Sequence, residues 1–184
     1  MAGRVAVRGV NLAGDGQADQ TVHGGPGKAV YAYPEEHAEF WQAAFPDVAI
    51  VPGVFGENLT VAGCLEEDVH IGDRFRAGTV ELIVTQPRIP CFKLGIRFGQ
   101  PRVVKRFLAE DRSGFYLTIA EAGEVAAGDP FVRLAEDPRR VSVADIVRIH
   151  RGEFDDPDLL RRAIAVPSFP EEFRRLYRQR LGEA

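Results

Sequence analysis

The sequence has few cysteines and no long apolar run. Its 184 residues include only two cysteines, Cys64 and Cys91. Two are too few for a disulfide framework or for a tetrahedral cysteine-rich zinc site. No apolar run approaches the roughly 20 residues that a membrane helix needs. The N-terminus has no apolar signal core, because arginines interrupt its apolar alternation, so we expect a cytoplasmic protein with no membrane segment.

The sequence also lacks an excess of positive charge. It has 23 Lys and Arg against 27 Asp and Glu, which gives a formal net charge of −4 at pH 7. Proteins that bind nucleic acids are usually basic, so we expect no nucleic-acid partner. Hydrophobic residues make up 45% and charged residues 27% of the chain, as in an ordinary globular protein with one substantial core.

The composition changes near the pair Asp137-Pro138. Residues 1–137 hold 17 of the 19 glycines, whereas residues 138–184 hold two glycines and ten bases, all of them arginine. Many short strands separated by glycine turns are typical of a closed or strongly bent antiparallel sheet. We therefore predict a mostly β, α+β fold with a barrel-like domain over 1–137 and a small three-helix domain over 138–184.

Local patterns set the expected elements. Alternating apolar and polar residues predict strands over 4–10, 28–33, 57–61, 69–75, 79–85, 114–120 and 131–134. Two helices interrupt them, beginning at Pro34 and Pro101. The tail contains three helix starts, at Ser142, Asp156 and Ser168. Helices this short bury little alone, so we expect them to pack on each other and on the sheet.

The most informative segment has the sequence QPRIPCFKL. Pro87 and Pro90 lack an N–H group and must end the strand that leads into it. Cys91 follows, flanked by Arg88 and Lys93, and positive neighbours favour a thiolate. A thiolate is what a soft metal or an electrophile requires. The alternative is a small hydrophobic residue in a loop, and the pattern alone does not separate the two.

Glycines gather in the segment GDGQADQTVHGGPGK, residues 14–28. Successive glycines let the backbone approach an anion, and Lys28 supplies charge. The spacing matches neither a phosphate-binding P-loop nor a dinucleotide fingerprint, and a flexible hairpin is the alternative. His23 could donate a proton, bind a metal or be a packed polar residue. In the next glycine-rich segment, Asn58 suits recognition of a heterocycle or closure of its own turn.

The remaining polar residues give weaker signals. Cys64 lies near acids in a segment that we predict to be a turn, so we expect it to be buried and unreactive. Asp73 stands in a tight turn and is expected to be solvated. His37 and His70 have no partner at metal-ligand spacing, and the sequence contains no GxSxG, HExxH or paired CxxC motif.

Taken together, these segments resemble the MOSC family, named for the C-terminal domain of molybdenum-cofactor sulfurase, and in particular its stand-alone bacterial members. The matching segments follow the family's order: GDGQAD, HGGP, FGENL, GD and QPRxPCxKL. The resemblance covers roughly residues 4–135. The three-helix tail is similar to the small C-terminal domain of that subgroup.

The resemblance implies a barrel-like core that binds the molybdenum cofactor, a pyranopterin whose dithiolene holds molybdenum. It implies that Cys91 is the protein's thiolate ligand to the metal. The cofactor carries a phosphate, so basic residues and backbone N–H groups should line its pocket. The binding candidates are Gly24, Gly25, Lys28, Asn58, Arg88 and Lys93.

The activity that the resemblance implies is reduction of N-hydroxylated compounds, such as hydroxylamino nucleobases and amidoximes, to their amino forms. The candidates for proton delivery are Asp19, His23 and Asp73. No cysteines remain for an iron–sulfur cluster and no flavin motif is present, so a separate flavoprotein or iron–sulfur reductase should supply electrons. Pyridoxal phosphate, mentioned in some descriptions of the family, is not favoured, because no lysine context selects a Schiff base.

Other functions use the same residues. One is a cofactor carrier that stores or passes on the molybdenum cofactor without turnover. Another is a sulfur carrier, or a metal-free transferase or hydrolase, that uses Cys91 directly. For the tail, the arginine-rich helices are either a solvated cap, which the small net charge favours, or a docking module for a reductase.

Overall fold

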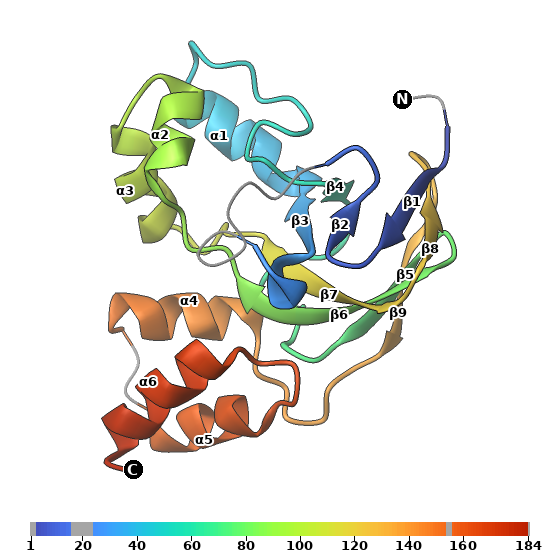
Figure 1. Ribbon diagram of the computed structural model, residues 1–184. Coiled ribbons are helices and arrows are strands. Elements are labelled where there is room, and N and C mark those ends of the chain that lie inside the picture. Colours follow the sequence, from blue (N-terminus) through green and yellow to red (C-terminus); the bar gives the residue numbers. More distant parts are fainter. Residues whose placement is uncertain (1–2, 16–23, 154–155, 184) are drawn as a thin grey trace.

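A curled six-stranded sheet forms the centre of the fold (Figure 1). The computed structural model describes residues 3–15, 24–153 and 156–183. The strand order is β4-β3-β7-β6-β5-β9, and β3 and β4 are parallel while the other neighbours are antiparallel. The strands are β3 (Val30–Pro34), β4 (Leu59–Val61), β5 (Arg74–Ala77), β6 (Val80–Pro87), β7 (Phe115–Glu121) and β9 (Phe131–Ala135).

A smaller sheet of three strands extends the curl in the order β2-β1-β8. Its strands are β1 (Val5–Arg8), β2 (Asn11–Leu12) and β8 (Gly123–Val125). The chain passes from β7 to β8 at Gly123, where a Cβ would lie 2.5 Å from the Thr79 hydroxyl oxygen. Only glycine allows that approach, so Gly123 lets the chain turn from one sheet into the other.

The main apolar core lies inside the curled sheet and continues into the C-terminal helices. Phe75, Leu82 and Leu117 of the sheet share one buried cluster with Ile146 and Leu160 of the tail. The tail therefore packs on the sheet, as its short amphipathic helices predict. The barrel-like α+β architecture with three C-terminal helices is confirmed.

Three helices stand over one end of the sheet, at the upper left of Figure 1. They are α1 (Ala38–Ala44), α2 (Phe92–Phe98) and α3 (Arg102–Ala109). With β3 they enclose a second, mainly aromatic cluster, made of Tyr31, Tyr33, Trp41, Phe45, Val54, Phe55, Leu94, Phe98, Val103 and Phe107. Two short 3-10 turns precede α1 in the chain, η1 (Pro26–Lys28) and η2 (Glu35–His37).

Helix α2 is an element that the pattern analysis did not predict. Its residue Gly95 faces α3, and a Cβ there would lie 3.2 Å from the Cα of Pro101. The absence of a side chain lets the two helices pack closely, although glycine lowers helix propensity. Gly99, in the left-handed conformation, ends the helix.

The tail forms α4 (Val143–Arg151), α5 (Pro157–Ala165) and α6 (Glu171–Leu181). Ser142 and Asp145 form the predicted capping box of α4, and Asp156 caps α5. The prediction for α6 is wrong in detail, because its N-cap is Pro170 rather than Ser168. Among the described residues, no helix is both long and apolar enough to cross a bilayer.

The predicted strand over 69–75 is mostly a tight turn, and β5 begins only at Arg74. Asp73 is not solvated as expected but fully buried. Its carboxylate accepts hydrogen bonds from the backbone N–H groups of His70, at 3.0 Å, and Asp137, at 2.8 Å. Those bonds fix the turn and hold the start of the tail against it, which offsets the cost of burying the acid.

Candidate functional site

The site is built where β6 ends. Val84 pairs with Leu117 and Gln86 pairs with Tyr116, so Thr85 is an extra residue in a β-bulge. A bulge interrupts the alternation of side chains and redirects those that follow it. Residues 84–87 are accordingly all buried, and the chain turns after Pro87 towards α2.

Cys91 lies at the end of that turn, as the N-cap residue of α2. Its thiol makes no capping hydrogen bond to the helix, and the residue is half-buried. It borders a cavity of about 270 Å³, whose lining is Lys28, Gln86, Pro87, Ile89, Pro90, Cys91, Tyr116, Glu172 and Phe173. The thiol of Cys91 is therefore available to a molecule bound in this cavity.

The glycine-rich loop supplies the cation of the cavity. Gly25 has φ 93°, a left-handed conformation that favours glycine, and it precedes the short turn η1. The hydroxyl of Thr85 donates to the carbonyl of Gly27 at 2.6 Å. The bulged strand thus holds the loop in place, and Lys28 reaches the same cavity as Cys91.

Gln86 provides an unsatisfied acceptor in the cavity wall. Its side chain is 2% exposed, and its Oε1 atom has no hydrogen-bond partner among the described residues. Buried amide oxygens in native proteins nearly always have a partner, from the protein, water or a ligand. This oxygen could accept a hydrogen bond from a polar group bound in the cavity.

The C-terminal tail forms one wall of the cavity. Glu172 and Phe173, near the start of α6, both line it. Glu172 Oε1 lies 3.8 Å from Lys28 Nζ, and the hydroxyl of Ser168 donates to the carbonyl of Val84 at 2.9 Å. Sequence patterns gave no sign of this role, because the two segments are far apart along the chain.

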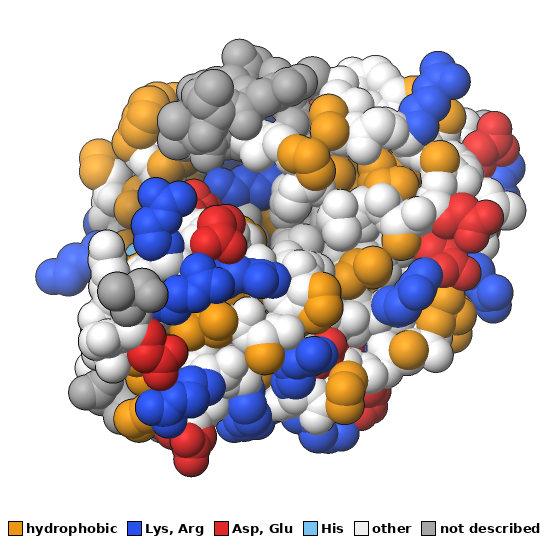
Figure 2. Space-filling model, turned by 60° about the horizontal axis from the view of Figure 1, so that its bottom comes forward, with side chains coloured by type: hydrophobic (Ala, Val, Ile, Leu, Met, Phe, Trp, Pro, Cys, Tyr) orange, Lys and Arg blue, Asp and Glu red, His pale blue; other side chains and the backbone are white. Residues whose placement is uncertain are grey.

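The rest of the tail surface is charged. Figure 2 shows the face that the C-terminal helices share, on which basic side chains stand with acidic side chains among them; the bases that these helices supply are all arginine. Several of these charges are paired, as in Arg178 with Glu171 at 2.9 Å and Arg161 with Asp158 at 3.2 Å. The tail is therefore more than a solvated cap, because its α6 also completes the cavity.

Arg88 takes a different direction from the one that the pattern predicted. Its guanidinium donates to the carbonyl of Phe55 and lies over the rings of Tyr31, at 5.0 Å, and Phe107, at 5.7 Å. It is not among the residues that line the cavity. Arg88 therefore joins the turn to the aromatic cluster, on the side away from the cavity lining, and the structure does not support a contact between Arg88 and a cofactor phosphate.

The buried groups behind Cys91 interact electrostatically. Burial acts to lower the pKa of Arg88, but Tyr31, Tyr116 and Cys91 outweigh it, so the pKa of Arg88 lies above its usual value. Burial raises the pKa of Tyr31 and of Tyr116, although Arg88 opposes both shifts. Both hydroxyls therefore stay neutral at ordinary pH.

Tyr116 is a cavity residue that the sequence analysis missed. It pairs with Gln86 across the bulge, and both side chains line the cavity. Its hydroxyl could donate to a bound oxygen or nitrogen atom. The alternating pattern over 114–120 predicts a strand there, but only the register of that strand against β6 puts Tyr116 beside Cys91.

Several predicted site residues do not meet Cys91. Lys93 is exposed on α2. Asn58 accepts from the N–H of Tyr31 at 2.8 Å and donates to Asp15 at 2.8 Å, and it borders a different cavity. These bonds join Asn58 to β3 and to the start of the glycine-rich segment, so its side chain links distant segments rather than closing its own turn. Gly24 and Gly25 precede η1 in the loop that carries Lys28 and are not themselves part of the lining.

The candidates for proton delivery are also not gathered at the cavity. Asp73 is buried elsewhere, with His70 Nδ1 and Arg133 Nε each 3.5 Å from its Oδ2 atom. Its carboxylate holds a turn, and Asp73 is not among the residues that line the cavity. Asp19 and His23 lie outside the described residues.

The two cysteines differ as expected. Cys64 is 5% exposed, and burial raises the pKa of its thiol, although Arg133 opposes that shift. A buried thiol with a raised pKa is a poor nucleophile and a poor metal ligand. The prediction that Cys64 is buried is confirmed.

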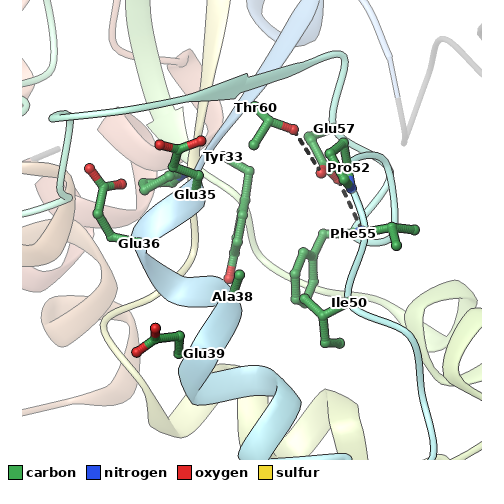
Figure 3. A pocket seen from close by; sticks show the side chains of 12 residues that line it. Tyr33, Glu35, Glu36, Ala38, Glu39, Ile50, Pro52, Phe55, Glu57 and Thr60 are labelled. Atoms are coloured by element: carbon green, nitrogen blue, oxygen red, sulfur yellow. Dashed lines mark hydrogen bonds between the residues drawn. The ribbon is translucent and has the colours of Figure 1, made fainter.

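A larger cavity of about 560 Å³ lies apart from Cys91 and shares no lining residue with its cavity. Figure 3 shows Glu35, Glu36 and Glu39 on one side of it, facing Ile50 and Phe55 on the other. Carboxylates at this density repel an anionic group. Of the two cavities, only the one at Cys91 combines a thiol with a cation.

Among the described residues, no three His, Cys, Asp or Glu side chains come close enough to form a metal site. The chain alone offers a metal a single soft ligand at the cavity, Cys91. A metal held here would need most of its ligands from a non-protein group.

Comparison with known proteins defines the family. A model of the MOSC domain matches residues 19–132, and the chain belongs to the MOSC domain family. It is 32% identical to protein YiiM of Escherichia coli (strain K12) over 180 residues, which are 97% of this chain and 80% of that protein. The crystal structure of YiiM from Geobacillus stearothermophilus superposes with a TM-score of 0.84 at 31% identity, over 98% of this chain and 86% of that chain.

A third relative is a protein named reductase from Gibberella moniliformis (strain M3125 / FGSC 7600). It is 35% identical over 149 residues, which are 79% of this chain but 26% of that protein. The expected family and its stand-alone bacterial type are thus confirmed.

Proposed function

We propose that the protein binds the molybdenum cofactor through Cys91 and uses it to reduce N-hydroxylated compounds to amines. The observation that carries the proposal is the meeting, in one cavity, of the half-buried thiol of Cys91, the cation Lys28 and the unpartnered oxygen of Gln86. Membership of the MOSC family supports the choice of cofactor. The reductase among the relatives supports an oxidoreductase, although this chain matches about a quarter of that protein.

The residues of the cavity fit the metal end of this cofactor. A thiolate is a soft ligand that suits molybdenum, and the dithiolene would supply the further sulfur ligands that the chain lacks. The volume of about 270 Å³ is just below the range typical of small-molecule sites. We infer that the cavity takes the metal and its nearest ligands, and that the pterin extends past the nine residues of the lining.

Charge also favours this cavity for a cofactor that carries a phosphate. Its lining has one base, Lys28, and one acid, Glu172, whereas the lining of the larger cavity of Figure 3 has four acids, Glu35, Glu36, Glu39 and Glu57, and no base. An ammonium group attracts a phosphate, and four carboxylates repel it. Lys28 is therefore the residue of the chain that we expect to hold the cofactor's anionic end.

The reaction balances as one hydroxylamine, two electrons and two protons giving one amine and one water. When bound, the cofactor would supply the two-electron capacity. The chain would supply the thiolate ligand, the apolar walls Ile89 and Phe173, and polar groups near the reacting atoms. The carboxyl group of Glu172 and the hydroxyl of Tyr116 line the cavity, and we propose Glu172 as the group that delivers protons from solvent.

Electrons must reach the site from outside the chain. The two cysteines that the sequence contains are engaged as a buried structural residue and as the proposed metal ligand. We therefore propose that a separate electron-donor protein supplies the electrons.

The test is the molybdenum and pterin content of protein made in a host that synthesises the cofactor. We compare the native chain with Cys91→Ser and, as a matched control, Cys64→Ser. A hydroxyl is a poor substitute for a thiolate on molybdenum, so Cys91→Ser should lose most of the metal while its circular dichroism stays native. Cys64→Ser should retain the metal.

The same preparations are assayed for reduction of a hydroxylaminopurine with dithionite-reduced methyl viologen. Native protein should turn over and Cys91→Ser should not. A full complement of molybdenum in Cys91→Ser would refute the ligand assignment. Bound cofactor without any turnover would point instead to a cofactor carrier, and thiol-dependent turnover in metal-free protein to a cysteine-based transferase.

A further inference from the structure

Helix α2 exposes apolar side chains directly after Cys91. Phe92 is 67% and Ile96 is 72% exposed, the largest values among the exposed large hydrophobic residues of the described chain. The two residues are four apart and lie on one face of the helix. The opposite face, formed by Leu94, Gly95 and Phe98, is buried. Exposed apolar residues that stand together mark an interaction site more often than scattered ones do.

The same part of the chain is strongly basic. Residues 92–109, which form α2, α3 and their connection, contain five bases and no acid, although the whole chain has a net charge of −4. The five are Lys93, Arg97, Arg102, Lys105 and Arg106, and all are exposed. Lys93 and Lys105 have no ion pair among the described residues. Charges this close act together over a Debye length of about 8 Å.

We propose that the exposed face of α2, with the basic residues of the α2–α3 hairpin around it, docks an acidic electron-carrier protein. This inference rests on the proposed reductase function. An apolar centre within a charged rim is the usual anatomy of a protein interface. The basic rim attracts an acidic partner and speeds its association.

Proximity to Cys91 explains why this face serves an electron carrier. Phe92 is bonded to Cys91, which is itself the N-cap of α2. A carrier seated on α2 would bring its redox group within a short distance of a metal held by that thiolate. Cleavage of the substrate's N–O bond takes up two electrons and two protons, so a flavin carrier could supply both electrons and a one-electron iron–sulfur carrier would have to dock twice per turnover.

Other occupants fit less well. A helix that lies in a membrane surface needs a broad apolar face, but the exposed residues of α3 include Arg102, Lys105 and Arg106. Nucleic-acid bases could stack on Phe92, but they would leave the aliphatic side chain of Ile96 without an apolar partner. The arginine-rich tail, the other candidate docking module, has several charges already paired and borders the cavity from α6.

The test measures binding of two acidic carriers, a flavodoxin and a plant-type [2Fe–2S] ferredoxin, to the protein as purified. The variant is Ile96→Ser with Lys105→Glu, which removes one exposed apolar group and reverses one charge. The matched control is Val132→Ser with Arg76→Glu. These residues are exposed and pair across β5 and β9, away from α2.

Native protein and the control should bind one of the carriers at 50 mM NaCl and bind it more weakly at 300 mM. The α2–α3 variant should bind it about tenfold more weakly, as expected for loss of a central apolar contact and a charge. Its turnover with methyl viologen should stay native, whereas turnover with the carrier should show a raised KM.

The docking proposal would be overturned if neither carrier bound, or if the control variant weakened binding as much as the α2–α3 variant did. It would also be overturned if α2–α3 bound phosphatidylserine vesicles or DNA in preference to the carriers. Selective carrier binding without reduction by viologen or by the carrier would support the docking face and count against the proposed function alone.

Discussion

Replacing Arg88 with methionine tests how the turn that carries Cys91 is held. Arg88 donates to the carbonyl of Phe55 and lies over two aromatic rings, those of Tyr31 and Phe107. Arg88→Met keeps most of the volume and removes the charge and the donor. The change leaves a buried carbonyl without that partner and removes both cation–π contacts.

The expected cost follows from those contacts. A hydrogen bond from a charged group contributes about 1.5–3 kcal/mol, and a desolvated cation–π contact about 2 kcal/mol. Relief of the guanidinium's desolvation offsets part of the sum. We expect the free energy of unfolding to fall by about 2–4 kcal/mol, which a domain stable by about 5–15 kcal/mol survives.

The assay is urea unfolding followed by fluorescence of Trp41, the chain's only tryptophan, which is buried in the same aromatic cluster. The control is Arg97→Met on α2, where Arg97 is exposed and makes one long bond, 3.4 Å, to the carbonyl of Gly53. It should change stability by no more than about 0.5 kcal/mol. If Arg88→Met were as stable as that control, the view of Arg88 as the anchor of the turn would be wrong.

Three further predictions concern the tail and the buried polar groups. Phe173→Ala should lower the free energy of unfolding by about 2 kcal/mol and enlarge the cavity, so the purified variant should retain less molybdenum than the native protein. Leu176→Ala, at a more exposed position, should retain the native amount. Equal molybdenum content in the two variants would contradict the role of the tail as a wall of the cavity. Glu66→Gln should lower the free energy of unfolding by about 3 kcal/mol. The carboxylate of Glu66 accepts from the N–H of Gly114 at 2.6 Å and lies 2.7 Å from His37 Nε2, and the single oxygen of an amide cannot replace both carboxylate oxygens. A melting temperature within about 2 °C of native would contradict this role of Glu66. Partial burial and the charge of Arg180 lower the pKa of His150, so the unfolded chain binds a proton at His150 more readily than the folded chain does. Stability should therefore fall as the pH drops below about 6.5. His150→Gln should reduce the slope of stability against pH between 7.5 and 5.5, and an unchanged slope would refute this role of His150.

The sequence predicted the elements whose patterns are local. Alternation located most of the strands, although the predicted strand over 69–75 is mostly a turn, and the pair Ser142 and Asp145 located the start of α4. Helix α2 was missed because Gly95 weakens its pattern, and that glycine serves the contact with α3. The start of α6 was misplaced because Ser168, a good capping residue, bonds instead to the carbonyl of Val84.

The positions of Arg88 and Lys93 show that sequence patterns do not predict the direction of a side chain in or next to a turn. Both stand within three residues of Cys91, and the sequence treated them alike. The turn directs Arg88 into the aromatic cluster, while α2 leaves Lys93 exposed. Side-chain direction depends on the backbone path, and a sequence of mixed turns does not specify that path by itself.

The sequence by itself determined the family, through short ordered segments, and singled out Cys91 on a proline-containing turn after a strand. Only the tertiary structure decided what surrounds that thiol. Tyr116 reaches it through the register of β7 against a bulged β6, and Glu172 and Phe173 reach it because the tail packs across the sheet. Distant segments come into contact because they bury their apolar side chains in one shared core. A local sequence pattern shows that a segment is amphipathic, but it does not specify which distant segment packs against it.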